Sequence, residues 1–554
     1  MPSGIMHLEA MPSSSRTAIL ASQSESKFAS LTCTDITPDS ASSKPPSGEE
    51  YLSGLRLHII TLSLAITMFL VSLDTTIIST AVPQITHDFK STAEVGWYGS
   101  SFLLGSAVTQ APWGKVYAYL PLKLVYLVSL GMFEVGCLIC AVSHNSSTLI
   151  VGRAIAGVGG SGIGSGIFTM IGVCFAPRKR PILIGIIGLA FLLASFVGPV
   201  VGGAFTSHLT WRWCFWINLP VGGWTFLLVL FAFRTPSFAA PPRVPWKEAL
   251  LQLDPAGVVL LTGSLLCFLL ALEWGVSRSW DHPDVIGCLV GFLLLAGLFL
   301  ANEIYQDDRA MVPRSFFLQK ALSISLAFIF LAAGAFFTLL YYIPIYFQAV
   351  EGVSAAESGI RTLPLVISAG VMAIFGAILL GVTGYPAPFM VLGGILICVA
   401  AGLLYTLDVA AQSRFWIPYQ ILAGLGIGTC LQVPIIYNQA SVASADMPTM
   451  TATTLFSKCL GASIFMQVGQ AIFLSRVKQQ FTSVPGIELS SDQILAAGLL
   501  VGEDSGSQAL AGVSSAYLLG LRDVYVLVVA ISALATLLAL FMGRERMVPV
   551  RLQI

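Results

Sequence analysis

Long apolar segments alternate with short polar connections along most of the chain, from residue 57 to residue 542. Each segment holds about twenty residues, the length with which an α-helix crosses about 30 Å of hydrocarbon. The pattern predicts fourteen transmembrane helices, at 57–82, 97–117, 122–143, 148–171, 181–206, 213–233, 255–274, 284–304, 321–347, 357–380, 387–408, 415–437, 450–474 and 523–542.

Composition supports a membrane protein from a different direction. Hydrophobic residues make up 56% of the 554 residues, charged residues make up 10%, and the mean hydropathy is +0.83. So little charge cannot cover the surface of a soluble globule of this size. The formal net charge is zero and no basic stripe with interleaved aromatic residues is present, which argues against nucleic acid as a partner.

The polar connections indicate the orientation of the chain. Lys and Arg favour the cytoplasmic side of short loops, and they gather in the connections that lie inside when both termini are cytoplasmic. Residues 1–56 are polar, rich in Ser, Thr and Pro, and lack a signal-peptide core, so we expect a disordered cytoplasmic tail there. Residues 543–554 are expected to form a second cytoplasmic tail.

Glycine and proline lie inside the predicted fifth helix, at positions that an ordinary structural helix avoids. Ala194, Gly198 and Gly202 repeat every fourth residue along one face, Pro199 lies in the middle of that face, and Gly203 follows. In a bilayer, small residues allow helices to approach closely, and neighbouring helices satisfy the backbone groups that proline frees. The pattern predicts a close-packed, moving helix. Ordinary helix packing is the alternative for any single glycine pair.

An internal repeat indicates how the helices are organised. GRAIAGVG at 152–159 aligns without gaps to YQILAGLG at 419–426, so the fourth and twelfth helices are predicted to be parallel copies. Two six-helix halves related by an axis along the membrane normal would produce this repeat. We therefore expect an N-terminal half at 57–233, a linker with two extra helices at 234–320, and a C-terminal half at 321–542.

Residues 194–223, ASFVGPVVGGAFTSHLTWRWCFWINLPVGG, resemble the antiporter motif of the major facilitator superfamily, small-x-x-x-Gly-Pro-x-x-Gly-Gly. The WRWCFWINLPVGG part is similar to the fourteen-span drug:proton antiporter branch. The resemblance covers residues 57–542 and implies an all-α membrane protein with the major-facilitator-type fold. It also implies that the protein exchanges protons for amphipathic organic molecules, as in fungal relatives that export toxins, antibiotics and other secondary metabolites.

Two further stretches carry the same resemblance with departures. GKVYAYLPLK at 114–123 keeps the Gly114, Lys115 and Lys123 of the family's cytoplasmic gate motif, but Ala118 stands where most members have an acid. The resemblance implies a gating role for these three residues and for the glycines of the fifth helix, while Ala118 cannot supply the acid of the gate's charge network. The fourth helix keeps the family's buried arginine as Arg153.

Few ionisable residues lie at membrane depth, where a charge is costly without a partner or a wet cavity. Asp74 and Glu134 are the acids, and Arg153 and Lys458 are the bases. A carboxylate that alternates between an apolar and a cationic environment can take up and release a proton, so we predict that Asp74, Glu134 and Arg153 couple transport to protons. Asp74 could instead be interfacial or bonded to a nearby Thr, and Glu134 could form a fixed pair with Arg or Lys.

Glu273 and Glu303 fall near helix ends and are interpreted as interfacial anchors rather than proton carriers.

An amphipathic ligand would require aromatic faces and a few amides at membrane depth. The candidate substrate-binding residues are Tyr341, Tyr342, Gln348, Gln432, Tyr437, Asn438 and Gln467. Polar contacts between packed helices use the same residue types and are the alternative at each position. Asn145-Ser-Ser is a glycosylation sequon that faces outward in the expected topology, in a very short loop.

These features favour a proton-coupled efflux pump for a small amphipathic molecule at the plasma membrane. Proton-coupled uptake, vacuolar transport of amino acids or siderophores, and a transporter-like membrane sensor are the alternatives. The chain has no G-x-x-x-x-G-K-[ST] phosphate loop and its ten cysteines show no metal-binding pattern, so we expect no enzyme activity, no cofactor and no metal. The expected partners are the small-molecule substrate, protons and the lipid bilayer, and we expect the protein to function as a monomer.

Overall fold

The computed structural model describes residues 51, 54–89, 95–236, 252–277, 280–306, 309–409, 411–482, 507–543 and 546–547. The described part of the chain is helical and contains no strand, as the apolar pattern predicts. Most of the predicted N-terminal tail, residues 1–50, 52 and 53, lies outside the described residues, and so do residues 544–545 and 548–554 of the predicted C-terminal tail.

The N-terminal half contains seven helical segments within the described residues. They are α2 (Gly54–Phe89), α3 (Val95–Tyr119), α4 (Leu122–Ala141), α5 (Ser146–Cys174), α6 (Arg180–His208), α7 (Trp213–Trp216) and α8 (Asn218–Ala232). In the linker region the described helices are α10 (Pro255–Ser277), α11 (Pro283–Gln306) and the short α12 (Arg314–Leu318).

The C-terminal half begins with α13 (Lys320–Ile345), which continues into a π-helical turn, η3 (Tyr346–Val350). The remaining described helices are α14 (Ala355–Thr383), α15 (Pro386–Tyr405), α16 (Ser413–Cys430), α17 (Val433–Ala440), α18 (Met447–Thr482) and α20 (Ser507–Leu540).

Every predicted transmembrane segment overlaps one helix or two consecutive helical segments, although several helix ends differ from the prediction. Among the described residues, 13 helices are long and apolar enough to cross a membrane. The predicted span 97–117 corresponds to α3, which is 25 residues long but rich in Gly and Ser and therefore less hydrophobic. α2 begins at Gly54, so the last residues of the predicted tail 1–56 are helical. α20 begins well before residue 523, because Arg522 and Asp523 form ion pairs with Asp408 and Arg476 and do not end the helix.

Two spans are broken where proline follows. α7 and α8 meet at Ile217, and α16 and α17 are separated by Leu431 and Gln432. Pro220 and Pro434 each lie within the first turn of the second segment, and the missing N–H cannot bond to the carbonyl four residues earlier, in the preceding segment, so the helix is interrupted there. Non-helical backbone at membrane depth is tolerated where it is covered by protein or lines a cavity.

The repeat detected in the sequence places equivalent contacts in both halves. A side chain at Gly157 would meet Phe102 on α3, and one at the equivalent Gly424 would meet Leu365 on α14. The next repeated glycines, Gly159 and Gly426, face α4 and α15 in the same way. α5 and α16 therefore pack as parallel copies in two similar frameworks.

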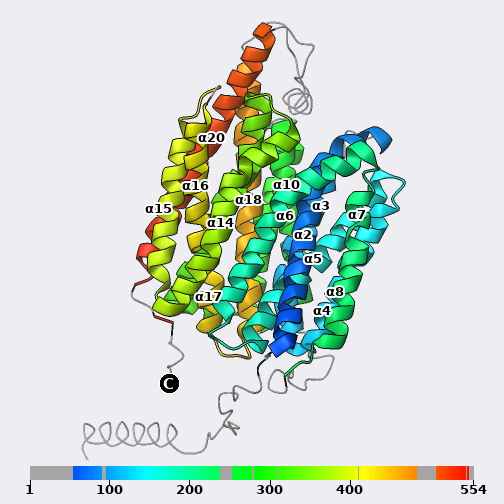
Figure 1. Cartoon of the computed structure of the whole chain (residues 1–554), viewed down its shortest axis with the longest axis vertical. Helices are drawn as coiled ribbons and strands as arrows, with labels where there is room; N and C mark the ends of the chain where they lie inside the picture. Colours follow the sequence, from blue (N-terminus) through cyan, green and yellow to red (C-terminus); the bar gives the residue numbers. More distant parts are fainter. Residues whose placement is uncertain are drawn as a thin grey trace, which may run out of the picture. The chain divides into compact units, whose positions relative to one another are not determined.

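The most extensive contacts between the two halves are those of α6 with α14 and of α3 with α18. Figure 1 shows α6 and α14 side by side where the halves meet. The N-terminal half is coloured blue to green, and the C-terminal half is coloured yellow-green to red. The extra helices α10 and α11 pack on each other, and α10 also contacts α3 and α18. This arrangement places α2, α5, α6, α14, α16 and α18 around the region between the halves.

Hydrogen bonds join α10 and α11 at one end of this helix pair. Asp254, which precedes α10, is buried and accepts from the Asn302 and Gln306 amides of α11 at 2.9–3.0 Å. The Glu303 carboxylate accepts from the backbone N–H groups of Met311 and Val312 at 3.2 and 2.9 Å. Glu303 therefore holds the segment after α11. The Glu273 side chain lies outside the described residues.

Candidate functional site

A buried ion pair joins α2 to α5. Arg153 Nη1 donates to Asp74 Oδ2, and the exposed fractions of the two side chains are 1% and 0%. Arg153 also donates from Nε to the carbonyl of Tyr98 at 3.0 Å, and its guanidinium lies 4.6 Å from the centre of the Phe102 ring. The interfacial position considered for Asp74 is wrong, because α5 brings a cation against the carboxylate. The low dielectric around this pair strengthens its attraction.

Two residues from other helices complete the surroundings of Asp74. Asn218 of α8 donates from Nδ2 to Asp74 Oδ1 at 3.2 Å, and the Cys137 thiol of α4 lies 3.9 Å from the same oxygen. Asn218 belongs to the WINLPVGG stretch, whose role the sequence did not show. Cys137, one of the cysteines without a metal-binding pattern, contacts this polar cluster. Sequence spacing could not reveal either contact, because the residues come from separate helices.

Glu134 lies one helical turn before Cys137 on α4. Its carboxylate faces Gly222, which lies one turn after Asn218 on α8, and a side chain at Gly222 would overlap Glu134 Oε1. Both carboxylate oxygens are buried, and neither has a hydrogen-bond partner among the described residues. No described Arg or Lys forms an ion pair with Glu134, so the fixed-pair alternative has no support in the structure. Asp74 of α2 thus meets α4 and α8 at Cys137 and Asn218, and Glu134 meets α8 at Gly222, one turn away.

The small face of α6 packs on α2 close to Asp74. A Cβ at Gly198 would overlap the Thr76 hydroxyl and would lie 2.9 Å from the Thr76 Cβ. Ala194 is buried, and its carbonyl accepts from the Thr76 hydroxyl at 3.3 Å. Close approach of the two helices at Gly198 is therefore confirmed.

The remaining residues of the motif contribute differently. Gly202 is buried, whereas a Cβ at Gly203 would meet no atom within 4 Å. Gly203 therefore makes no close helix contact, and a gating role for it stays a prediction. Pro199 lies inside α6, where it cannot donate to the carbonyl of Ser195. A hinge motion at Gly198 and Pro199 stays a prediction.

The predicted gate residues have three different environments. A Cβ at Gly114 would overlap Ala452 Cβ and would lie 3.1 Å from Thr449 Cα, so Gly114 forms a close contact between α3 and α18 and hence between the halves. Lys115 is buried beside it on α3. Lys123 instead donates to the carbonyl of Leu230 at 2.6 Å in the last turn of α8, where a cation favours the helix end. Lys123 thus acts within the N-terminal half.

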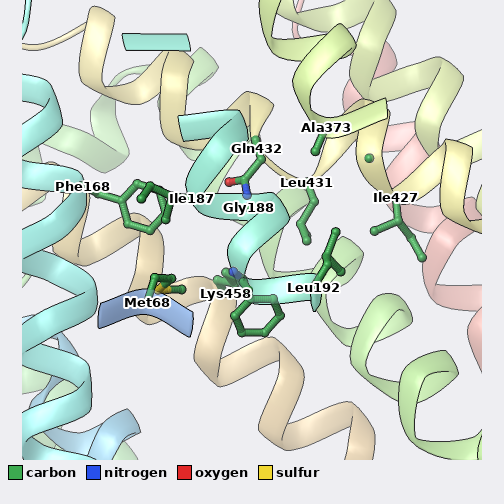
Figure 2. Close-up of a pocket in the computed structure, with 12 residues that line it drawn as sticks. Met68, Phe168, Ile187, Gly188, Leu192, Ala373, Ile427, Leu431, Gln432 and Lys458 are labelled. Carbon is green, nitrogen blue, oxygen red and sulfur yellow. The ribbon is translucent and has the colours of Figure 1, made fainter. Parts of the chain in front are cut away.

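A small cavity lies where the two halves meet, and Figure 2 shows side chains from both halves around it. It is lined by Met68, Phe168, Ile187, Gly188, Phe191, Leu192, Ala373, Ile427, Gly428, Leu431, Gln432 and Lys458. Gln432, a predicted substrate residue, reaches the cavity from the break between α16 and α17. Lys458, noted in the sequence only as a base at membrane depth, is the one charged residue in this lining of the described chain.

The other predicted substrate residues are not gathered at this cavity. Tyr342 packs against Phe473 at 5.7 Å between ring centres, and Tyr341 is 43% exposed. Asn438 donates to the Thr454 hydroxyl at 2.9 Å. These contacts match the packing alternative.

The rest of the set is also dispersed. Gln348 donates to the Ser358 hydroxyl at 3.3 Å, and Tyr437 is buried in α17. Gln467 lines a separate groove among α3, α10 and α18. Gln432 is therefore the member of the set on which a central binding site can be built.

Comparisons with known proteins agree with this architecture. The family model of the Major Facilitator Superfamily matches residues 64–466. The chain belongs to this superfamily. It is 41% identical to the MFS-type transporter thnB of Trichoderma harzianum over 504 residues, covering 90% of this chain and 87% of the relative. It is 38% identical to the probable efflux pump gsfJ of Penicillium aethiopicum over 511 residues, covering 92% and 91%.

Solved structures support the major facilitator fold. The proton:xylose symporter XylE matches with a TM-score of 0.57 at 12% identity, covering 88% of this chain and 96% of that structure. The human organic anion transporter MFSD10 matches with a TM-score of 0.56 at 15% identity, covering 88% and 100%. At these identities the likeness concerns the fold alone. The family and the relatives establish a multi-pass membrane transporter and not an enzyme.

Asn145 has a local structural role in this major facilitator protein. Its side-chain oxygen accepts from the backbone N–H of Thr148 at 2.8 Å and caps the start of α5. The residue is exposed in the short connection between α4 and α5. Helix capping alone explains an asparagine here, and glycosylation stays a prediction.

Proposed function

We propose that this transporter exports a small amphipathic organic molecule, such as a toxin, drug or secondary metabolite, across the plasma membrane in exchange for protons. The observation that carries the proposal is the buried Asp74–Arg153 ion pair with the unpartnered Glu134 one turn away. Relatives named as efflux pumps support the direction of transport. In this proposal both termini are cytoplasmic.

Proton uptake begins at Asp74. A proton that binds its carboxylate neutralises the charge that holds Arg153 and weakens the ion pair between α2 and α5. Asn218 and Cys137 connect this position to Glu134, which lies one turn farther along α4 and α8 toward the proposed cytoplasmic side. Transfer of the proton to Glu134, and then to the cytoplasm, restores the Asp74 carboxylate and its ion pair.

The contacts of α6 connect the proton site on α2 with the interface between the two halves. Thr76, two residues after Asp74, bonds to Ala194 of α6 and packs against Gly198. Near its other end, α6 packs on α14 of the C-terminal half, where a Cβ at Gly185 would lie 3.1 Å from Ile374 Cα. A shift of α2 on protonation would therefore bias the contact between the halves, which alternating access requires.

Reconstituted liposomes test this proposal. With an acidic lumen, wild-type protein should drive accumulation of one or more dyes from a panel of amphipathic fluorescent dyes, and a protonophore should abolish the accumulation. Asp74→Asn should lose the gradient-driven flux while eluting as folded protein. Asp284→Asn is the matched control, because its carboxylate is 47% exposed at the start of α11.

Three results would contradict this proposal for proton-coupled export. Gradient-driven flux at the wild-type rate in Asp74→Asn removes this carboxylate from coupling. If cells that express the protein accumulate more dye, and if this accumulation rises further with external acidity, the protein is an importer. That result would favour the alternative of proton-coupled uptake or vacuolar transport. A protein that moves no dye in either direction while retaining its fold favours the sensor alternative.

A further inference from the structure

The central cavity combines an amine with an apolar and aromatic wall. α18 contributes Lys458, α6 contributes Phe191, and the break between α16 and α17 contributes Gln432. No acidic residue is among the lining residues of the described chain. In Figure 2 the amine of Lys458 and the amide of Gln432 lie on opposite sides of a turn of α6.

Within the described part of the chain, Lys458 has no anionic partner. Its exposed fraction is 8%, and among the described residues no ion pair or hydrogen bond to its amine is formed. The contact that the amine does make is with the Phe191 ring, 5.1 Å from the ring centre. A buried ammonium without a counter-charge is destabilising, so an anionic group that entered the cavity would be bound favourably beside it.

Gln432 is also incompletely satisfied. Its exposed fraction is 7%, and its side-chain oxygen is buried without a hydrogen-bond partner in the described chain. Its amide nitrogen packs tightly on Gly188, where a Cβ would overlap it. The helix break places this amide where a polar group of a ligand can reach it.

Aromatic rings surround the amine on the other side. Phe191 lies 6.5 Å from Phe336 and 5.9 Å from Phe337 between ring centres, and the latter contact is edge-to-face. These residues join α6 to α13 across the two halves. An aryl group that entered between the halves would find ring faces next to a cation.

The cavity is small in this conformation. The space open to the centre of a water molecule is about 20 Å³, enough for about one water. Drug-sized ligands occupy pockets of roughly 300 Å³ or more. Binding therefore requires α6 and α14 to separate, which is the movement that the transport cycle makes.

We propose that Lys458, Gln432 and Phe191 form the binding site for an amphipathic aryl anion, a carboxylate, sulfonate or phenolate, whose charged group pairs with the Lys458 amine. The aryl part lies against Phe191, and Gln432 bonds a second polar group. This inference rests on the proposed export function and specifies its substrate class. A cationic amphipath would meet repulsion at Lys458.

Two dyes with one skeleton test the charge requirement. Anilinonaphthalenesulfonate is an aryl anion, and phenylnaphthylamine has the same rings without the sulfonate. Binding to the purified full-length transporter in nanodiscs at fixed pH should be saturable and tighter for the anion. Lys458→Met should weaken binding of the anion by about thirtyfold, the loss expected when one partner of a desolvated charge pair is removed. The affinity of the same variant for the neutral dye should change by less than about twofold.

Lys458→Arg is the charge-preserving control and should retain most of the affinity for the anion. Thermal unfolding gives a second measurement, because Lys458→Met removes an uncompensated buried charge. The variant should have a higher Tm than wild type without dye, and it should lose the extra stabilisation that the anion gives to wild type.

Equal loss of both dyes in Lys458→Met, unchanged binding of the anion, or no saturable binding of the anion to wild type overturns the proposal. These measurements use no pH gradient, so they do not depend on proton coupling. Loss of anion selectivity in Lys458→Met together with normal gradient-driven flux in Asp74→Asn would sustain the anion site and contradict the proton proposal. The reverse combination would contradict the anion site alone.

Discussion

The Thr76 hydroxyl of α2 donates to the carbonyl of Ala194 on α6 across 3.3 Å, two residues beyond Asp74. Gly198, one turn farther along α6, admits the Thr76 side chain because it has none of its own. The acid proposed to bind the proton and the helix that contacts the other half are therefore joined by a direct packing contact. In the proposed mechanism, a movement of α2 on protonation of Asp74 would reach α6 through this contact, without an intervening loop.

Substitution of Gly198 tests this contact. Gly198→Ala forces its Cβ into the Thr76 side chain, so α2 and α6 must separate, at a cost of about 1–3 kcal/mol. We expect a lower Tm and gradient-driven transport reduced by about tenfold, the change that corresponds to roughly 1.4 kcal/mol. Gly203→Ala is the control on the same helix, because its Cβ enters open space. Equal behaviour of the two variants would show that the close approach at Gly198 has no role in transport.

Glu134 within α4 and Glu303 in the last turn of α11 should respond oppositely to neutralisation. Glu134 has no hydrogen-bond partner among the described residues, whereas Glu303 accepts two backbone N–H groups. Glu134→Gln should therefore keep or raise the Tm, while Glu303→Gln should lower the stability by about 1–2 kcal/mol because one N–H loses its acceptor.

Transport measurements should also distinguish the Glu134→Gln variant from the Glu303→Gln variant. Glu134→Gln should lose gradient-driven flux but retain dye exchange at equal pH, and Glu303→Gln should keep its coupling. Thermal unfolding and liposome flux measure the two effects independently. A lower Tm for Glu134→Gln, or full coupling in that variant, would contradict the role proposed for Glu134.

Gln439 is expected to hold the two halves together. Its amide donates to the carbonyl of Phe168 on α5 at 2.9 Å, a bond from the C-terminal half to the N-terminal half. Nearby, a Cβ at Gly172 would lie 2.6 Å from the Met447 sulfur. Gln439→Ala should shift the population toward separation of the halves at this end. The shift follows from the loss of a buried hydrogen bond, about 1 kcal/mol.

Electron–electron distances between spin labels on α5 and α18 measure this shift, and longer distances should gain population in Gln439→Ala. Asn438→Ala is the adjacent control, because Asn438 bonds to Thr454 within the C-terminal half. Unchanged distances in Gln439→Ala, or the same shift in both variants, would show that this bond does not control the contact.

A pH-dependent stability is expected from Glu351, at the end of η3. Burial raises the pKa of its carboxyl, although the ion pair with Arg361 opposes the shift. A raised folded-state pKa means that the folded protein holds the proton more tightly. The resulting stability is present below the unfolded pKa, about 4.3, and is lost as the pH rises through the raised value. Wild type should therefore lose Tm relative to Glu351→Gln as the pH rises from mildly acidic to neutral.

Thermal unfolding across that pH range, with Glu357→Gln as control, checks this sign. Glu357 also pairs with Arg361 but is 50% exposed, so its substitution should give a nearly constant Tm difference. A constant difference for Glu351→Gln, or a relative gain of the wild type as the pH rises, would show that burial does not dominate at Glu351.

The sequence by itself determined the class of the protein and much of its framework. Apolar length is a local property, so the membrane helices could be placed from composition along the chain. The repeat could also be detected locally, and the structure bears it out in detail. Arg153 and its repeat equivalent Gln420 both donate to a backbone carbonyl of the neighbouring helix, at 3.0 Å in each half. Close packing at Gly198 followed from the absence of a side chain in a bilayer helix.

Only the tertiary structure decided which side chains meet. Asp74 and Arg153 are 79 residues apart, and Asp74 and Asn218 are 144 apart. Whether such residues touch depends on how each helix is rotated about its axis and which helix it packs against. A hydropathy pattern with apolar residues on every face does not specify that rotation. For the same reason the cavity beside Lys458 could not be predicted, since its walls come from both halves and exist only where α6, α14 and α18 converge.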